Sequence, residues 1–373
     1  MNILYVARLS DSKLKEKLTP LLGSSLVDHI YVLRDFPGIN FDSRVTYLSP
    51  EKCTINIFRH ISKVFKGVKY CRKRKIDVIF GVLNTPHGYI GRTIGFLTRL
   101  PYIHLTIAGH REFWLDGKIM ERVNCLLFRH SAFTMVTGSQ TKKYLESKRF
   151  DPDRVVVIPN IPDNAFLNIT NVPAIEERKY DIIFISRIDK NKNLELLFQA
   201  LSILKSNYSP KVLVVGDGPD LKRMQDLSYE LELDKYIDFE GYISKIEEKI
   251  YTYNKAKIFV SCSRGEGFPV SLLEAMCCGC VPVVSNVGDI VDAIAQGVSG
   301  YVFNDVDNPE ELAHYLLSLF EDHSLLMKMS EASRMINTKV SVDRNTEIWD
   351  NVLSQLYREK NETNFFRRYI SGR

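Results

Sequence analysis

Short apolar runs alternate along the chain with longer segments whose apolar residues recur at helical spacing. The runs are rich in Val, Ile and Phe and are bounded by polar residues, which is typical of buried strands. They lie at Asn2–Ala7, His29–Leu33, Val45–Leu48, Ile76–Gly81, Tyr102–Ala108, Ala132–Thr137, Val155–Ile158, Tyr180–Ile185, Lys211–Val215, Ile237–Glu240, Ala256–Cys262, Val281–Ser285 and Gly300–Phe303. Strands that alternate with helices indicate parallel sheets with crossover helices, so the pattern predicts an α/β protein.

The alternation is interrupted once, near the middle of the chain. Asn160–Phe166, with the sequence NIPDNAF, leads into a stretch rich in Asn, Pro and Glu that continues to about Lys179. A chain of 373 residues is also too long for one typical domain. We predict a first domain over 1–165, a linker over 166–179, a second domain over 180–338, an amphipathic helix over about 341–360 and a basic, aromatic tail over 361–373.

Composition narrows the class of protein. A hydrophobic content of 45% and a charged content of 25% are typical of a soluble globular chain, and a net charge of +5 does not by itself indicate nucleic-acid binding. The seven cysteines show no zinc-like spacing, which favours reduced thiols. No apolar run has the roughly 18–20 residues of a spanning helix, and the start MNILYVARLS is not typical of a signal peptide. We therefore expect a cytoplasmic protein.

The segment Gly265–Cys280, GEGFPVSLLEAMCCGC, carries the strongest chemical signal. It lies between two predicted buried strands, so it forms a strand-to-helix turn in a β–α–β unit. Gly265 and Gly267 allow a tight turn and a close approach of the backbone to a ligand, and Pro269 suits the first turn of the helix. The start of that helix offers unpaired N–H groups to an anion. Two glutamates that bracket such a site can hold neutral hydroxyl groups on either side of the anion.

Two further loops follow predicted strands of the second half. The loop after Tyr180–Ile185 holds Arg187 and Lys192, which suit a phosphate because arginine offers two parallel N–H donors and lysine a point charge. The next loop, Gly216–Pro219, is a tight turn whose glycines would keep the backbone thin near a ligand. Each loop taken alone also fits an ordinary solvated turn.

The string Glu266-x₇-Glu274, with Gly-Phe-Pro after the first glutamate and Glu-Ala-Met at the second, resembles the signature of family 4 retaining glycosyltransferases of the GT-B fold. The resemblance is strong over about 180–335 and weaker in the first half. It implies two Rossmann-like α/β/α domains whose parallel sheets face each other across a cleft. In this family the last helix returns to the first domain, which binds the acceptor, while the second domain binds the nucleotide sugar.

The resemblance also implies roles for single residues. Glu266 would hold the donor sugar, Glu274 the ribose, and Arg187 and Lys192 the diphosphate, with charge on the leaving group stabilised by them and by the helix start. Backbone groups near Ile243 would read the base. The implied donor site further comprises Gly216, Gly218, Gly267, Phe268, Val270, Ser271 and Leu272. No metal and no cofactor are expected, because Arg and Lys neutralise the diphosphate and the Asp-x-Asp strings at 151–153 and 305–307 are typical of turns.

The first half departs from the family pattern at several positions. No glycine follows the first strand, and Ile161 stands where the family has Gly. A histidine usually ends the strand corresponding to Tyr102–Ala108, often as His-Gly, whereas this chain has Gly109-His110. His110 is the candidate for contact with the donor sugar, His87 is a rival, and His104 fits a core histidine within a strand.

These observations predict a retaining hexosyl- or N-acetylhexosaminyltransferase. It would use a UDP-sugar in preference to a GDP-sugar, and a glycan or lipid-linked acceptor in cell-surface polysaccharide synthesis such as that of capsule or O-antigen. Other readings are a non-catalytic nucleotide-sugar-binding protein, a sugar-nucleotide epimerase of similar fold and a membrane-bound scaffold. Donor hydrolysis or transfer would distinguish an enzyme of this family from the first two.

Contact with an anionic membrane is a further expectation. The predicted helix over 55–75 has an apolar stripe and a basic face that includes Lys63, Lys66, Lys69 and Arg72, and the tail over 364–373 adds aromatic and basic residues. Both would place the protein on the inner face of the cell membrane. A basic face that is merely solvated is the alternative.

Overall fold

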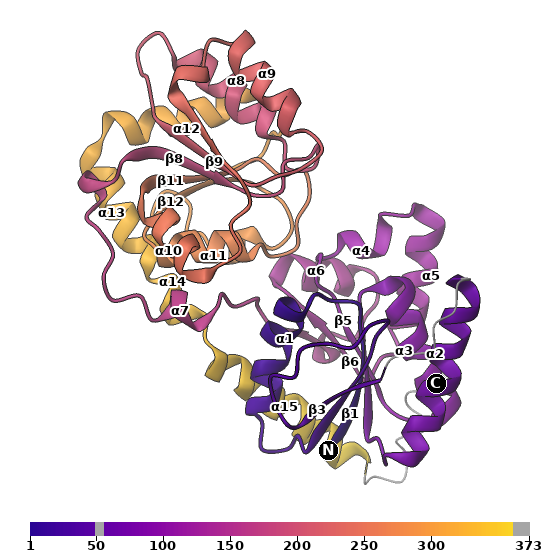
Figure 1. Ribbon diagram of the computed structural model, residues 1–373. Coiled ribbons are helices and arrows are strands. Elements are labelled where there is room, and N and C mark those ends of the chain that lie inside the picture. The colour runs from indigo at the N-terminus through magenta and orange to yellow at the C-terminus, as the bar shows by residue number, and fades with distance from the viewer. Residues whose placement is uncertain (49–55, 361–373) are drawn as a thin grey trace. The chain divides into compact units, whose positions relative to one another are not determined.

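The computed structural model describes residues 1–48 and 56–360, which form two compact units. Unit 1 comprises Met1–Pro159 and a returning helix that begins at Val342, and unit 2 comprises Asn160–Ser341. Each unit is a parallel sheet with helices on both faces (Figure 1). The predicted fold class, two Rossmann-like α/β/α domains, is confirmed.

The sheet of unit 1 has seven parallel strands in the order β3-β2-β1-β4-β5-β6-β7. The strands are β1 Asn2–Val6, β2 His29–Leu33, β3 Val45–Leu48, β4 Val78–Val82, β5 Tyr102–Leu105, β6 Phe133–Val136 and β7 Val155–Val157. Most of their residues are buried, as expected for a parallel sheet covered on both faces. Because all seven strands are parallel, their carboxyl ends lie at the same edge of the sheet.

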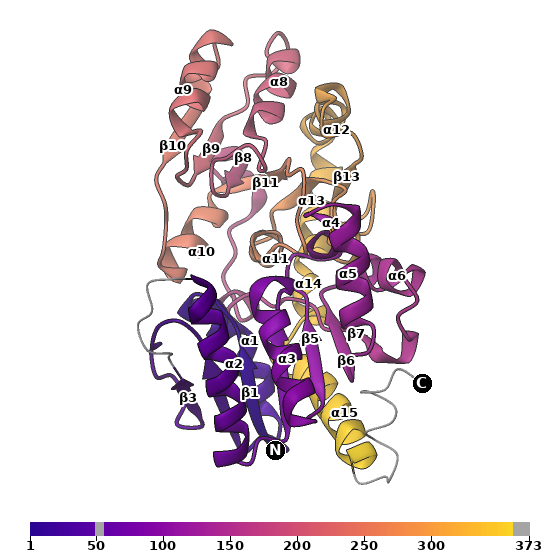
Figure 2. The ribbon, with the colours of Figure 1, turned by 90° about the vertical axis from the view of Figure 1, so that its right-hand side faces the viewer.

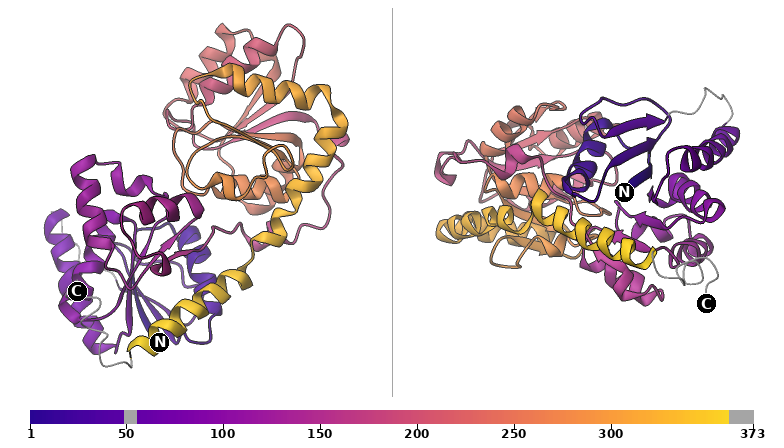
Figure 3. Two further views of the ribbon diagram at one scale, coloured as in Figure 1. Left: turned by 180° about the vertical axis from the view of Figure 1, so that it is seen from behind. Right: turned by 90° about the horizontal axis from the view of Figure 1, so that it is seen from below.

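Two groups of helices cover the two faces of this sheet. The helices are α1 Asp11–Gly23, α2 Asn56–Lys73, α3 Tyr89–Thr98, α4 Arg111–Trp114, α5 Lys118–Phe128, α6 Ser139–Ser147 and α15 Val342–Lys360. On one face α1 and α15 pack together, and Figure 3 shows α15 in yellow along the unit. Trp349 of α15 stacks on Phe80 of β4 at 5.4 Å between ring centroids. The opposite face is covered by α2, α3 and α5 (Figure 2).

One expectation about the predicted basic helix is wrong. Lys63 of α2 is fully buried, and its ammonium group lies 2.7 Å from the carboxylate of Asp35 and 3.3 Å from Nε2 of His87. A buried ammonium needs such partners, because leaving it unpaired away from water is costly. Lys63 therefore belongs to the interior of unit 1, whereas Lys69 and Arg72 of the same helix are exposed. Residue 55 and the tail over 364–373 lie outside the described residues.

The sheet of unit 2 has six parallel strands in the order β10-β9-β8-β11-β12-β13. They are β8 Tyr180–Ile185, β9 Val212–Val215, β10 Ile237–Glu240, β11 Ala256–Ser261, β12 Val281–Ser285 and β13 Tyr301–Phe303. The helices are α7 Asn164–Leu167, α8 Leu194–Leu204, α9 Leu221–Glu230, α10 Ile246–Asn254, α11 Val270–Cys277, α12 Pro309–Glu321, α13 His323–Arg334 and α14 Ile336–Lys339. Helices α8, α9 and α12 cover one face, and α10 and α11 the other (Figure 1).

The division between the units falls at Pro159 and Asn160, before the linker predicted over 166–179. Two buried side chains explain why this segment belongs to unit 2. Phe166 packs edge-on against Tyr253 of α10 at 6.0 Å between ring centroids, and Ile175 lies in the core of unit 2. Among the described residues, no helix is both long and apolar enough to span a bilayer.

Candidate active site

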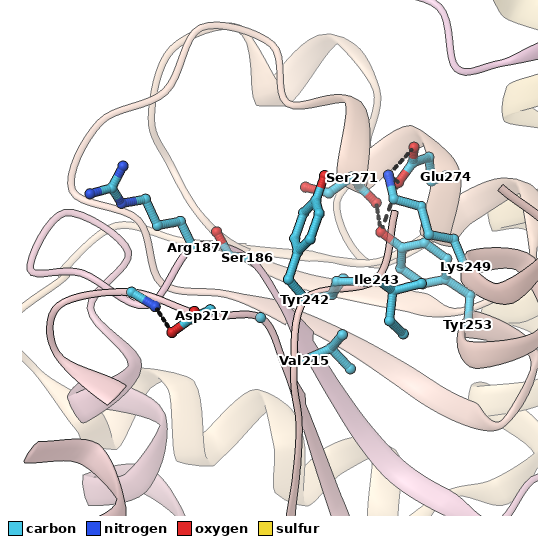
Figure 4. Close-up of a pocket in the computed structure, with 13 residues that line it drawn as sticks. Ser186, Arg187, Val215, Asp217, Tyr242, Ile243, Lys249, Tyr253, Ser271 and Glu274 are labelled. Carbon is cyan, nitrogen blue, oxygen red and sulfur yellow. Dashed lines mark hydrogen bonds and ion pairs between the residues drawn. The ribbon is translucent and has the colours of Figure 1, made fainter. Parts of the chain in front are cut away.

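A cavity of about 600 Å³ opens at the carboxyl ends of β8 and β9 in unit 2, next to α10 and the start of α11. Loops at this edge of a doubly wound sheet are where such folds usually bind ligands. Figure 4 shows Arg187 and Glu274 at opposite ends of the cavity. Its lining residues are Ile185, Ser186, Arg187, Val215, Gly216, Asp217, Gly218, Tyr242, Ile243, Lys249, Tyr253, Ser271 and Glu274.

The loop after β8 places one cation in the cavity and a second beside it. The side chain of Arg187 is 70% exposed, and its Nε lies 3.4 Å from the carboxylate of Asp189, so the guanidinium remains accessible to a ligand. Lys192 does not line the cavity; its ammonium group pairs with the carboxylate of Glu266. The two residues predicted to bind the diphosphate thus have different partners: Arg187 contacts Asp189, and Lys192 contacts Glu266.

The glycines of the loop after β9 have a packing role. A methyl group on Gly216 would overlap the carbonyl oxygen of Ser186, and one on Gly218 would overlap that of Ile188. Gly216 also has a φ of +136°, which L side chains rarely adopt. Both glycines therefore let the loops after β8 and β9 lie against each other, and this close packing shapes one wall of the cavity.

The first glutamate of the motif is held by the loop around it. Glu266 accepts a hydrogen bond from Ser263 at 2.8 Å in addition to its pair with Lys192. The amide of Asn191 donates to the carbonyl oxygen of Gly265 at 3.0 Å, which ties the motif to the loop after β8. Glu266 does not line the cavity, but its partner Lys192 joins it to the same loop as Arg187.

Helix α11 follows Pro269, which is its N-cap residue, and Cys278 and Gly279 end it. The first N–H groups of a helix have no partner within the helix, so the turn at Val270 and Ser271 presents donors. Ser271 lines the cavity, whereas the side chains of Phe268 and Leu272 are buried in the unit. The carbonyl oxygen of Phe268 also accepts a hydrogen bond from Asn160 at 2.5 Å.

Five of the predicted donor residues are therefore found in the cavity lining. They are Gly216, Gly218, Ile243, Ser271 and Glu274. Gly267, Phe268, Val270 and Leu272 belong to the turn and helix beside the cavity and do not line it. A role for Phe268 and Leu272 in donor binding would have to come from their backbone, because their side chains are in the core.

Glu274 is the buried carboxylate of the cavity. Both of its oxygens contact the ammonium group of Lys249, at 3.1 and 3.3 Å, and Oε2 also accepts a hydrogen bond from the hydroxyl of Tyr253 at 3.1 Å (Figure 4). Burial raises the pKa of Glu274 above its usual value, and the neighbouring Lys249 and Tyr253 oppose that rise. A carboxylate has about four acceptor sites, so these contacts leave capacity for a ligand hydroxyl.

Lys249 and Tyr253 were not among the residues predicted from the sequence. They lie four residues apart on α10, which places them on the same side of that helix. The sequence gives little indication of a role for these two residues, because a lysine and a tyrosine at this spacing are common on solvated helices. Their role becomes visible only when the fold brings α10 next to α11.

Tyr242 is the exposed aromatic residue of the cavity. Its side chain is 76% exposed even though it lines the cavity, and Figure 4 shows its ring between Arg187 and Glu274. Ile243 beside it also lines the cavity. An accessible aromatic ring in a pocket can stack on a planar group such as a nucleobase.

The candidate histidines belong to unit 1. His110 precedes α4; its N–H donates to Thr141 at 3.1 Å, and its ring lies 5.1 Å from that of Tyr144. His87 is buried beside Lys63, and burial lowers its pKa to about 4. His104 is a satisfied core residue, as predicted, bonded to Tyr102 and Asn84 at 2.9 Å each. A role for His110 in the donor site stays a prediction.

Replacing Lys249 by methionine should make the binding of UDP, which the sequence predicts, more sensitive to acid. The variant loses the ammonium group that lowers the pKa of Glu274, so this pKa rises further and the carboxylate becomes protonated at a higher pH. If a ligand hydroxyl needs the ionised form, affinity falls as pH drops through this pKa, and the midpoint of the fall moves upward in the variant. Calorimetric titration with UDP between about pH 5 and 8 measures it.

Lys245→Met is the matched control for this experiment, because Lys245 immediately precedes α10 but pairs with Glu248 at the surface. Its pH profile should match that of the unaltered protein. Identical profiles for Lys249→Met and the unaltered protein would show that Lys249 does not control the charge of Glu274.

Comparison with known proteins finds similarity to a family of transferases over part of the chain. Residues 166–335 match the model of the glycosyl transferases group 1. The poly(glycerol-phosphate) alpha-glucosyltransferase of Bacillus subtilis is 26% identical over 301 residues, which cover 78% of this chain and 41% of that protein. The N-acetyl-alpha-D-glucosaminyl L-malate synthase of Bacillus anthracis is 29% identical over 282 residues, or 72% of either chain.

Solved structures agree on the fold. HepE of Anabaena, in complex with UDP and glucose, has a TM-score of 0.76 at 17% identity over 95% of this chain and 99% of that one. The lipopolysaccharide outer core galactosyltransferase WaaB has a TM-score of 0.75 at 14% identity over the same shares. The chain has the GT-B fold, and residues 166–335 match the model of the glycosyl transferases group 1, a match of the kind that the Glu266–Glu274 motif predicted.

Proposed function

We propose that the protein is a retaining glycosyltransferase that moves a hexosyl or N-acetylhexosaminyl group from a UDP-sugar to a hydroxyl of a glycan or lipid-linked acceptor. The observation that carries the proposal is the layout of the cavity in unit 2. A buried carboxylate, Glu274, lies at one end, an accessible guanidinium, Arg187, lies at the other, and the start of α11 contributes Ser271. A nucleoside diphosphate has ribose hydroxyls and phosphates that match these groups in turn.

The relatives support the finer parts of the proposal. Two of them are named for α-linked glucosyl transfer, and one of these, the alpha-monoglucosyldiacylglycerol synthase of Acholeplasma laidlawii, makes a glycolipid by its name. The sugar of UDP-glucose is itself α-linked, so an α-linked product from such a donor means retention of configuration. The complex of HepE with UDP and glucose favours UDP as the nucleotide part of the donor. A glycan or lipid-linked acceptor fits a role in the synthesis of cell-surface polysaccharide. The transfer would take place in the cytoplasm, at the inner face of the membrane.

The mechanism follows from the charges around the cavity. Ribose hydroxyls would donate to Glu274, and the ring of Tyr242 would stack on the base. As the bond from the sugar to the diphosphate breaks, negative charge grows on the phosphate oxygens, and Arg187, Lys192 and the N–H groups at the start of α11 would stabilise it. These groups supply the positive charge that a metal ion supplies in other transferases. Lys192 would then lie between the phosphate and Glu266, which would hold the sugar hydroxyls.

A nucleotide screen tests the proposal. Thermal unfolding is followed with UDP, GDP and ADP, and a ligand at a hundred times its dissociation constant should add about 2.7 kcal/mol to the stability of the protein. Release of UDP from a panel of UDP-sugars then measures turnover. We expect UDP to stabilise the protein most, and Glu274→Ala to lose about 1.5–3 kcal/mol of binding free energy.

Glu248→Ala is the control variant, because Glu248 lies on α10 near Lys249 but its side chain is at the surface. Its affinity for UDP should not change. The proposal would be contradicted if none of UDP, GDP and ADP stabilised the protein. Binding of UDP-sugars without any UDP release, with or without acceptors, would instead support a non-catalytic nucleotide-sugar-binding protein.

A further inference from the structure

The peptide group that leads into α11 has a single polar atom. Pro269, the N-cap residue of α11, has no N–H group, so only the carbonyl oxygen of Phe268 can form a hydrogen bond there. This oxygen accepts a hydrogen bond from Nδ2 of Asn160 at 2.5 Å, and the residues at both ends of the bond are buried. A buried carbonyl group without a donor is costly, so the bond ties Asn160 firmly to this peptide group.

Asn160 has a special place in the chain, because it is the first residue of unit 2 and directly follows Pro159 of unit 1. Within unit 1, Nδ2 of Asn345 on α15 donates to the carbonyl oxygen of Pro159 at 2.9 Å. An asparagine amide therefore holds the backbone on the unit 1 side of this boundary, and Asn160 itself holds Phe268 on the unit 2 side. The chain thus enters unit 2 at a residue that is bound to the segment with the glutamate motif.

We name residues 262–269, which connect β11 to α11, the motif loop. Within it, Phe268 lies two residues after Glu266 and two residues before the first residue of α11. The carbonyl oxygen of Gly267 accepts a hydrogen bond from the N–H of Asp289 at 2.7 Å. The two peptide groups that flank Phe268 are therefore both bound by residues from outside the motif loop. A shift at Phe268 would move both Glu266 and the first N–H groups of α11, because only one residue lies between Phe268 and each of them.

The groups that would hold the nucleoside and the phosphates on the other side of the cavity are fixed by other elements. Glu274 is held by Lys249 and Tyr253 of α10, and Arg187 extends from the loop after β8. Loss of the bond between Asn160 and the motif loop should therefore leave this part of the cavity in place.

We propose that Asn160 is a positioning residue for the transfer reaction. By binding Phe268 it sets the position of Glu266 and of the first N–H groups of α11, which act on the donor sugar and on the breaking bond in the proposed function. The inference rests on that proposed function and adds to it a residue outside the lining of the donor cavity. A misplacement of reacting groups by about 1 Å can cost about a hundredfold in rate, so the loss of one buried hydrogen bond should have a large effect on turnover.

Two variants test the inference by turnover and by affinity for UDP. Asn160→Ala leaves the carbonyl group of Phe268 without this donor, and Asn160→Asp keeps the size of the side chain but introduces a carboxylate, which has no hydrogen to donate. Below the unfolding temperature of each variant, kcat for the release of UDP from a UDP-sugar should fall about tenfold or more. Calorimetry should give the same affinity for UDP as in the unaltered protein, because the groups around Glu274 stay in place.

Ser333→Ala is the matched control, since Ser333 is also buried in unit 2 and donates to a backbone carbonyl oxygen, that of Cys280, at 2.8 Å. It should lower the unfolding temperature as Asn160→Ala does, yet keep a normal kcat. A normal kcat in both variants of Asn160 overturns the inference. A loss of kcat in which UDP affinity falls by the same factor also overturns it, because the bond would then merely support the fold. Failure of the proposed function is distinct, since the unaltered protein would then neither bind UDP nor release it.

Discussion

Replacing both Arg187 and Lys192 by methionine should lower the turnover of a UDP-sugar by about a hundredfold or more. This is the scale of removing one group that stabilises charge in a transition state. Both side chains lie on the loop after β8, and Arg187 is mostly exposed, so the loss of charge should affect catalysis more than folding. Release of UDP from the donor, with a thermal unfolding curve for each variant, measures the two effects separately.

Lys190→Met provides the comparison. Lys190 is an exposed cation of the same loop but does not line the donor cavity, so its replacement should leave turnover within about twofold of normal. Lys192→Met alone is informative as well, because it leaves Glu266 without its ammonium partner. If the double variant of Arg187 and Lys192 retains near-normal turnover, the diphosphate is held by other groups.

Gly288→Ala should both destabilise unit 2 and abolish donor binding. Gly288 has a φ of +60°, and a methyl group on it would overlap the backbone carbonyl oxygens of Gly267 and Glu266. Backbone atoms cannot move aside as a flexible side chain does, so the motif loop must shift. The left-handed backbone alone costs an alanine about 1–2 kcal/mol, and the overlap adds to that cost. Thermal unfolding and calorimetry with UDP measure the two consequences.

The chain contains a control that isolates the backbone effect. Gly297 has a φ of +73°, but a methyl group there would meet no atom within 4 Å. Gly297→Ala should therefore show only the cost of the left-handed backbone and should bind UDP normally. Equal stability and equal UDP affinity for the two alanine variants would show that the close contact of Gly288 with the motif loop has no role in the site.

The fold was predictable because parallel strands leave a clear pattern. Runs such as Val281–Ser285 are buried on both faces of the sheet, so they lack the alternation of a half-exposed strand and stand out from the amphipathic helices between them. The segment 166–179 was harder to interpret. Its composition resembles a linker, yet Phe166 and Ile175 are buried in unit 2, and single apolar residues in a polar stretch give little periodicity.

The candidate site was predictable where the chemistry lies within one short motif. Ser271 and Glu274 belong to one turn and helix, so the sequence places them together, and both line the cavity. Lys249 could not be found in this way, because its partner Glu274 lies on another helix. Lys63 shows the converse case: in the sequence it continues a basic pattern, and its burial is explained by Asp35 and His87, which are distant in the sequence.

Helix α15 has a consequence for the order in which the protein forms during synthesis. It completes the core of unit 1 with Trp349, Leu353 and Leu356, yet it is translated after the whole of unit 2. Unit 2 is one continuous segment, so it can fold while α15 is still inside the ribosome, although the first strands of unit 1 emerge earlier. Unit 1, whose first strands are made first, is thus completed last. A ribosome that stalls near residue 341 would leave the apolar residues of unit 1 that α15 covers open to chaperones.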